Sequence, residues 1–114
     1  MKYTYEEIAG MIDHSLLKPT LTDEEFIKGC KIASEYKVAS VCVRPCDVKQ
    51  AAELLENSDV LVTTVIGFPH GTTTMATKML ETTEAIENGA CELDIVINIG
   101  KVKSGEYSYI KAEL

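Results

Sequence analysis

Three runs of β-branched and aliphatic residues, separated by segments with helical spacing, constrain the fold of this chain more than any other feature. The runs lie at residues 38–45, 59–71 and 91–100, and the intervening helical segments lie at residues 21–37, 46–58 and 72–89. The two later runs lack a clean apolar–polar alternation, which is typical of parallel strands covered on both faces. Strands and helices in this order predict an α/β fold with right-handed crossovers.

The first helical segment has an unusually complete start. Thr22 is placed as the N-cap, and Glu25, three residues later, completes a capping box. Leu21 and Phe26 are spaced for a hydrophobic staple across this box. We expect three helical faces to pack inward: Phe26, Ile27, Cys30 and Ala33; then Val48, Ala51, Ala52 and Leu55; then Met75, Met79, Thr83 and Ile86.

The two ends of the chain complete the expected order of elements. Residues 3–19 read as a helix that leads into a loop, and residues 104–114 begin a further helix. No linker divides the chain, so residues 1–114 are expected to form a single domain. The sheet would then have two open edges, which argues for an incomplete structure, the front part of a larger fold.

Composition excludes several classes of function. The formal net charge is -7 and the pI is about 4.8, which argues against a nucleic-acid partner or an anionic membrane surface. The longest apolar run is too short to span a bilayer, and the first ten residues have no signal-peptide core. The four cysteines form no CxxC pair, so we expect buried or partly buried free thiols and a cytoplasmic location.

One carboxylate interrupts the third apolar run. Asp94 stands between Leu93 and Ile95, where removal from water is costly without a partner. On the strand it shares a face with Val96 and Asn98, and an inward carboxylate of this kind is a candidate for proton transfer. The alternative is a structural Asp that accepts loop hydrogen bonds or pairs with a buried lysine.

The two histidines carry weaker signals. His70, in the "GFPHG" turn, could bind a ligand or relay a proton, but a solvated turn residue is the favoured interpretation. For His14, in "IDHSLLKP", a hydrogen-bonded structural role is favoured.

The motifs "IDHSLLKP", "SVCVRP", "TTVIGFPHG", "GACELDIVINIG" and "KSGEY" occur in this order. Together they resemble the deoxyribose-phosphate aldolase family, class I aldolases, over essentially the whole chain. The resemblance implies that the chain contains the first three β/α units of a TIM (β/α)8 barrel, preceded by a helix. It also implies reversible cleavage of 2-deoxy-D-ribose 5-phosphate to acetaldehyde and D-glyceraldehyde 3-phosphate, through a lysine Schiff base and without a metal or other cofactor.

The resemblance also implies roles for individual residues. Asp94 matches the family's proton-relay carboxylate. The substrate pocket would be lined by Cys42, Val65, Asp13, Ser15 and Leu17. Cys91 departs from the family, which usually has an acidic residue there. The Schiff-base lysine and its helper lie on the sixth and seventh strands of the family's barrel, beyond Leu114, so we expect no aldolase activity from this chain alone.

Two alternatives remain beside an N-terminal aldolase fragment. The chain could be a non-catalytic interaction module on a partial aldolase scaffold, pairing its open edges with another chain. A small metalloenzyme that uses Asp94 and His70 ranks last, because two ligands fall short of a defined site. In each case we expect homo-oligomers or association through the sheet edges.

Overall fold

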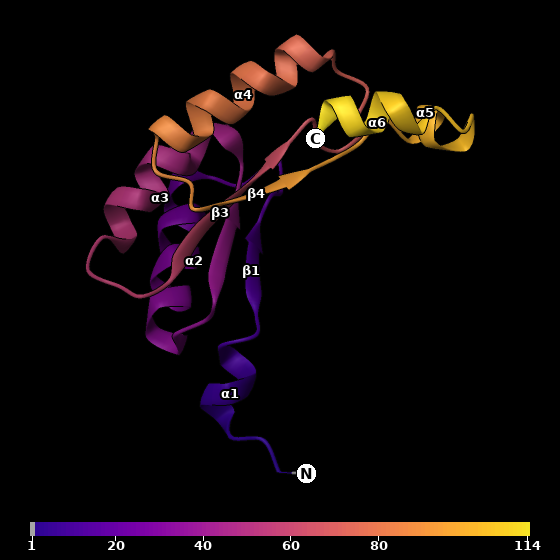
Figure 1. The fold of residues 1–114 in the computed structure, drawn as a ribbon. Helices are drawn as coiled ribbons and strands as arrows, with labels where there is room; N and C mark the ends of the chain where they lie inside the picture. The colour runs from indigo at the N-terminus through magenta and orange to yellow at the C-terminus, as the bar shows by residue number, and fades with distance from the viewer. Residues whose placement is uncertain (1) are drawn as a thin grey trace.

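The computed structural model describes residues 2–114 and has a four-stranded parallel sheet at its centre (Figure 1). The strands are β1 (Asp13–Leu16), β2 (Ser40–Val43), β3 (Leu61–Ile66) and β4 (Glu92–Ile95), and they pair in the order β1-β2-β3-β4. Each neighbour is parallel to the next. The fold class is confirmed: strands alternate with helices as in part of an α/β barrel, and the barrel is incomplete.

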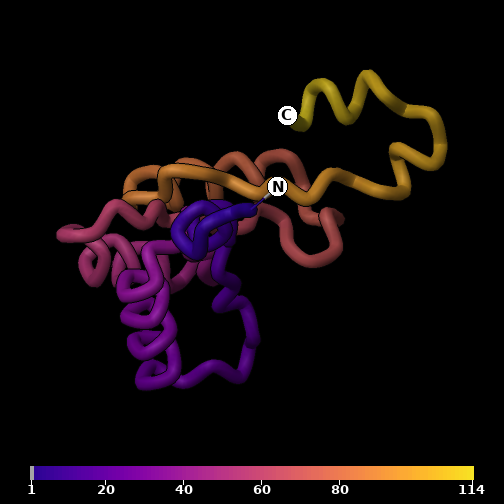
Figure 2. The backbone as a smooth tube through the Cα atoms, turned by 90° about the horizontal axis from the view of Figure 1, so that it is seen from below, coloured from indigo at the N-terminus to yellow at the C-terminus, as the bar shows by residue number. Residues whose placement is uncertain are grey.

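Helices occupy the connections between the strands and both ends of the chain. They are α1 (Tyr5–Ala9), α2 (Asp23–Tyr36), the 3-10 turn η1 (Pro45–Asp47), α3 (Val48–Leu55), α4 (Met75–Glu87), α5 (Ile99–Lys103) and α6 (Tyr107–Glu113). Helices α2, α3 and α4 lie on one side of the sheet and leave the other side uncovered (Figure 1). In the turned view the segment that contains α5 and α6 projects away from the body (Figure 2). No helix in residues 2–114 is long and apolar enough to cross a membrane.

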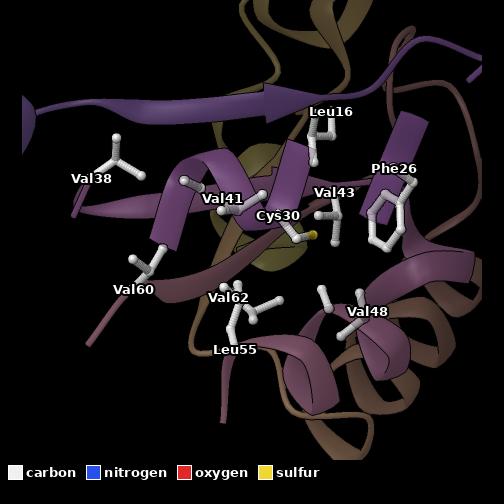
Figure 3. Close-up of a cluster of buried hydrophobic side chains, with 12 residues drawn as sticks. Leu16, Phe26, Cys30, Val38, Val41, Val43, Val48, Leu55, Val60 and Val62 are labelled. Atoms are coloured by element: carbon white, nitrogen blue, oxygen red, sulfur yellow. The ribbon is translucent and has the colours of Figure 1, made fainter. Parts of the chain in front are cut away.

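The core lies between the sheet and helices α2 and α3 (Figure 3). Val41 and Val43 of β2 face Phe26 and Cys30 of α2, and all four side chains are buried. The predicted capping box of α2 is present: the Thr22 hydroxyl accepts from Glu25 N at 3.3 Å, and Glu25 Oε2 accepts from Thr22 N at 2.9 Å. The predicted inward face of α3 is also confirmed, with Ala52 only partly buried.

The structure corrects the sequence analysis at the first strand. Residues 13–16, for which we predicted a loop, form β1 and pair with β2 from Asp13↔Ser40 to Leu16↔Val43. The short segment lacks a hydrophobic run because its alternate residues face opposite sides of the sheet, and Leu16 alone is buried. The sheet therefore has four strands rather than three, and Asp94 lies on the fourth.

Two predicted helical faces also need correction. Ile27 of α2 is exposed, and Gly29 takes its place beside Phe26, Cys30 and Ala33. The predicted stripe on α4 is wrong, because Met79 is 68% exposed and Ile86 is 56% exposed. The buried residues of α4 are instead Lys78 and Ala85. A polar residue replaces the expected apolar one because the Lys78 amine hydrogen-bonds to backbone carbonyls of neighbouring loops.

Candidate functional site

The uncovered face of the sheet carries a cavity of about 380 Å³ that all four strands help to form. All six residues predicted for the site line it: Asp13, Ser15, Leu17, Cys42, Val65 and Asp94. Four further residues line the cavity, Phe68, Leu93, Ile95 and Val96, of which sequence reasoning had placed only Val96 on the face of Asp94. Sequence reasoning missed Phe68 because it lies in the turn after β3, inside the run that we predicted as a strand. It missed Leu93 and Ile95 because strand alternation assigns the two neighbours of Asp94 to the opposite face.

The strand register explains why these residues meet. Ser15 pairs with Cys42, and Val65 pairs with Asp94. Because successive side chains of a strand alternate between faces, these residues lie opposite the buried Val41 and Val43. One face of the sheet thus builds the core, and the other presents its side chains to the cavity.

Three potentially charged groups gather in this cavity. One ligand atom from each of Asp13, Cys42 and Asp94 lies within 4.8 Å of the others. The Ser40 hydroxyl donates to Asp13 Oδ1 at 2.7 Å and so fixes the Asp13 carboxylate. Burial, together with the nearby carboxylates of Asp13 and Asp94, raises the pKa of the Cys42 thiol to about 11. Cys42 is therefore a neutral thiol near pH 7 and a weak nucleophile.

The same three groups are the residues that could hold a metal ion. Two carboxylate oxygens and a sulfur would suit a borderline cation such as Zn²⁺, which prefers four ligands in structural sites. Asp13 and Asp94 are both exposed, and exposed acidic groups often gather without an ion. The grouping by itself does not define a metal centre.

The Asp94 side chain has no hydrogen-bond donor among residues 2–114. The structural alternative from the sequence required loop donors or a buried lysine as its partner. The buried lysine of the described chain, Lys78, pairs with Glu113 instead. Asp94 is thus an exposed carboxylate beside a cavity, available to a bound molecule.

The histidines lie outside this cavity. His70 is exposed in the turn after β3, as predicted, and is absent from the carboxylate–thiol group, which leaves the Asp94–His70 metal hypothesis without support. His14 is half-buried on β1 and lines an apolar groove between α1 and α2. It makes no side-chain hydrogen bond to any residue in 2–114, so the predicted hydrogen-bonded role is not met.

The cysteine prediction holds in part. All four thiols are free, and Cys30 and Cys42 are buried. Cys46 and Cys91 are exposed, contrary to prediction. Cys91 immediately precedes β4, and its backbone N–H donates to Val62 O at 2.8 Å, a main-chain contact that any side chain except proline's permits.

This chain is similar to known proteins in sequence and in structure. No family model matches the chain. The deoxyribose-phosphate aldolase of Caldanaerobacter subterraneus subsp. tengcongensis is 54% identical over 107 residues, which cover 94% of this chain and 46% of the relative. The Clostridium kluyveri enzyme of the same name is 50% identical over 109 residues, which cover 96% of this chain and 50% of the relative. The chain therefore spans about half the length of the curated relatives it matches.

Solved structures that are similar to this chain carry the same name as its sequence relatives. A Coccidioides immitis protein assigned to the deoxyribose-phosphate aldolases superposes with a TM-score of 0.93 at 37% identity, covering 97% of this chain and 44% of that one. The tetrameric deoxyribose phosphate aldolase of Aeropyrum pernix gives a TM-score of 0.81 at 29% identity, covering 96% of this chain and 50% of that one. In sequence and in fold, this chain is similar to about half of a deoxyribose-phosphate aldolase.

Proposed function

We propose that this chain supplies the N-terminal half of a deoxyribose-phosphate aldolase active site. The reaction would be reversible cleavage of 2-deoxy-D-ribose 5-phosphate to acetaldehyde and D-glyceraldehyde 3-phosphate. The observation that carries the proposal is the convergence of all six predicted site residues on one cavity, in a chain about half identical to named aldolases.

Asp94 is the proposed proton-relay residue. A carboxylate that faces a cavity without a protein donor is free to exchange a proton with a bound substrate or an ordered water. Asp13, Ser15, Leu17, Cys42 and Val65 would form the wall against which the substrate is oriented. Cys42 would contribute shape rather than nucleophilic chemistry, since its pKa of about 11 keeps the thiol neutral.

The Schiff base needs an unprotonated amine that this chain does not offer. Lys78 is buried, but its Nζ donates to Gly71 O, Val96 O and Glu113 Oε1, which uses all three protons of an ammonium. The other lysines in residues 2–114 are at least partly exposed, so they lack the desolvation that activates a lysine amine for Schiff-base formation. We therefore propose that residues 1–114 alone are inactive and that the reactive lysine comes from the other half of the barrel.

A chimera tests this proposal. Residues 1–114 are joined to the remaining half of the Caldanaerobacter relative, and cleavage of 2-deoxyribose 5-phosphate is measured for the chimera and for residues 1–114 alone. Borohydride is added in parallel to trap the Schiff base for mass spectrometry. We expect turnover and a single trapped lysine, outside residues 1–114, only in the chimera. A folded chimera without turnover, or turnover by residues 1–114 alone, would contradict the proposal.

The edge of the sheet at β1 supports the alternative of an interaction module. The β1 edge is open, and beside it lies an apolar groove of about 450 Å³ lined by Tyr5, Ile8, Ile12, Ile32 and Tyr36, among others. A module that pairs with another chain would use such a surface. If the chimera folds without activity while residues 1–114 bind another chain through β1, the result would favour the interaction module over the aldolase.

A further inference from the structure

Lys78 joins three parts of the chain that are distant in sequence. It lies on α4 with 3% of its surface exposed. Its Nζ donates to Gly71 O at 3.0 Å, in the loop after β3, and to Val96 O at 2.7 Å, just beyond β4. Its third partner is the Glu113 carboxylate on α6, at 2.5 Å. Because every ammonium donor has an acceptor, the charge is buried without an unsatisfied proton.

Glu113 completes this arrangement from the other side. Its side chain is fully buried, and its second oxygen accepts from Asn98 N at 2.9 Å. Burial alone would raise the pKa of Glu113, but the hydrogen bonds from Lys78 and Asn98 outweigh burial and hold the pKa below its usual range. The Glu113 carboxylate therefore connects α6 both to Lys78 and to the backbone that follows β4.

The loop after β3 is tied to the same helix. The Glu81 carboxylate, one turn beyond Lys78 on α4, accepts from Gly67 N at 2.8 Å. Gly67 O in turn accepts from Gly71 N at 2.7 Å. A Cβ on Gly71 would overlap the carbonyl oxygen of Ile97, so this loop lies directly on the segment that follows β4.

That segment begins two residues after Asp94. Beyond Ile95 the strand ladder ends, and residues 96–98 are held to the sheet by one backbone bond, from Val96 N to Ile66 O at 2.9 Å. Lys78 and Glu113 add two further bonds, to Val96 O and from Asn98 N. The backbone that continues from Asp94 therefore depends on this ion pair for most of its attachment.

We propose that Lys78, with Glu113 as its counterion, is a positioning residue for Asp94. The pair sets the conformation of residues 96–98 and of the loop after β3, and so fixes the direction in which Asp94 and Phe68 face the cavity. Lys78 touches no substrate in this proposal; it acts through the backbone. The inference rests on the proposed function only for the catalytic role of Asp94.

The test compares a double variant with a matched control in residues 1–114. Lys78→Met alone would leave Glu113 buried and unpaired, which can unfold the chain, so Lys78→Met is combined with Glu113→Leu to remove the pair together. Lys103→Met, an exposed lysine of α5, is the control. Backbone amide exchange is measured at residues 96–98 and 40–43, and the carboxyl ¹³C chemical shift of Asp94 is measured by NMR.

We expect the double variant to exchange at least tenfold faster at residues 96–98, with β2 unchanged, and to move the Asp94 carboxyl signal. The Lys103→Met control should change neither. An unmoved Asp94 signal would overturn the proposal, even if exchange at residues 96–98 rises, because Lys78 would then stabilise the loop without orienting the carboxylate.

The chimera supplies the functional measurement. There the double variant should lower kcat by at least tenfold while KM stays within about twofold and borohydride still traps the Schiff base. Equal loss of Schiff-base trapping and kcat, or an unchanged kcat, would overturn the positioning role. If the parent chimera itself is inactive, the proposed function fails, and the Asp94 carboxyl signal still decides the role of Lys78.

Discussion

At the scale of single residues, Asp94 and Lys78 are two charged side chains with opposite surroundings, because Lys78 is buried and Asp94, which the sequence suggested would be removed from water, is exposed. Lys78 is removed from water and has three acceptors, whereas Asp94 stays exposed and has no side-chain donor within residues 2–114. A buried polar group whose hydrogen bonds are all made within the protein is suited to stabilise the structure. A polar group that faces a cavity without such bonds is suited to bind a ligand. Val96, two residues after Asp94, links the two residues, because its carbonyl oxygen accepts from the Lys78 amine.

Asp94→Asn in the chimera tests the catalytic part of this distinction. The amide keeps the shape of the side chain but cannot accept a proton, so we expect kcat to fall by about 10²–10⁴-fold with Schiff-base trapping retained. Steady-state kinetics and borohydride trapping check this. Asp59→Asn, an exposed carboxylate that does not line the cavity, is the matched control and should leave kcat unchanged. A kcat close to that of the parent would make Asp94 a structural residue.

Gly71 and Gly105 form a matched pair for a second residue-scale prediction. Both have positive φ, at 68° and 75°, but a Cβ on Gly71 would overlap Ile97 O, while a Cβ on Gly105 would meet nothing within 4 Å. Gly71→Ala should lower the free energy of unfolding by more than Gly105→Ala, which itself should cost about 1 kcal/mol. Urea denaturation measures both. Equal losses would show that φ strain alone matters and that the loop does not lie on the segment after β4.

At the scale of elements, the sequence predicted helices better than it predicted helix faces. The capping box at Thr22 defined the start of α2 because its signal is local. The buried face of α4 could not be predicted in the same way. Lys78 is buried because of acceptors contributed by Gly71, Val96 and Glu113, and no periodicity within the helix reports those distant partners. Similarly, β1 is a strand because β2 pairs with it, not because its own four residues favour one.

Thr22→Ala tests the energetic weight of the cap. The substitution removes the hydroxyl that accepts from Glu25 N, so we expect the free energy of unfolding to fall by about 1 kcal/mol. Urea denaturation monitored by circular dichroism checks this. Thr20→Ala, an exposed neighbour without a side-chain hydrogen bond in the described chain, should change stability by less than about 0.5 kcal/mol. The same loss in both variants would mean that the box does not stabilise α2.

At the scale of the whole molecule, the candidate site follows from topology. Sequence reasoning placed Asp94 on an inward strand face, and the family resemblance implied that Cys42 and Asp13 line the pocket; the structure brings these three residues to one cavity. Sequence reasoning could not supply Phe68, because the contribution of the turn after β3 to the cavity wall depends on the conformation of that turn. The chain spans about half the length of the relatives it matches.

Self-association is the prediction that belongs to this scale. Both sheet edges are open, and Tyr5, Ile8, Ile12 and Tyr36 are each more than 40% exposed beside the β1 edge. Sedimentation velocity of residues 1–114 should show dimers or larger species whose proportion rises with concentration. Ile8→Glu should reduce association, and Lys103→Glu, on the remote α5, should not. A monodisperse monomer with cooperative unfolding would contradict the prediction.

Because all three hydrogen-bond donors of the Lys78 amine are in use, the reactivity of this amine can report whether the chain is in its native state. An amine reacts with an acylating reagent through its free lone pair, and Lys78 can offer none while its three donors hold Gly71, Val96 and Glu113. Brief treatment with an N-hydroxysuccinimide ester should therefore label the exposed lysines and spare Lys78, with labelling of Lys78 appearing as urea unfolds the chain. Peptide mapping by mass spectrometry would follow this site alone, so one lysine would report when the two loops and α6 separate.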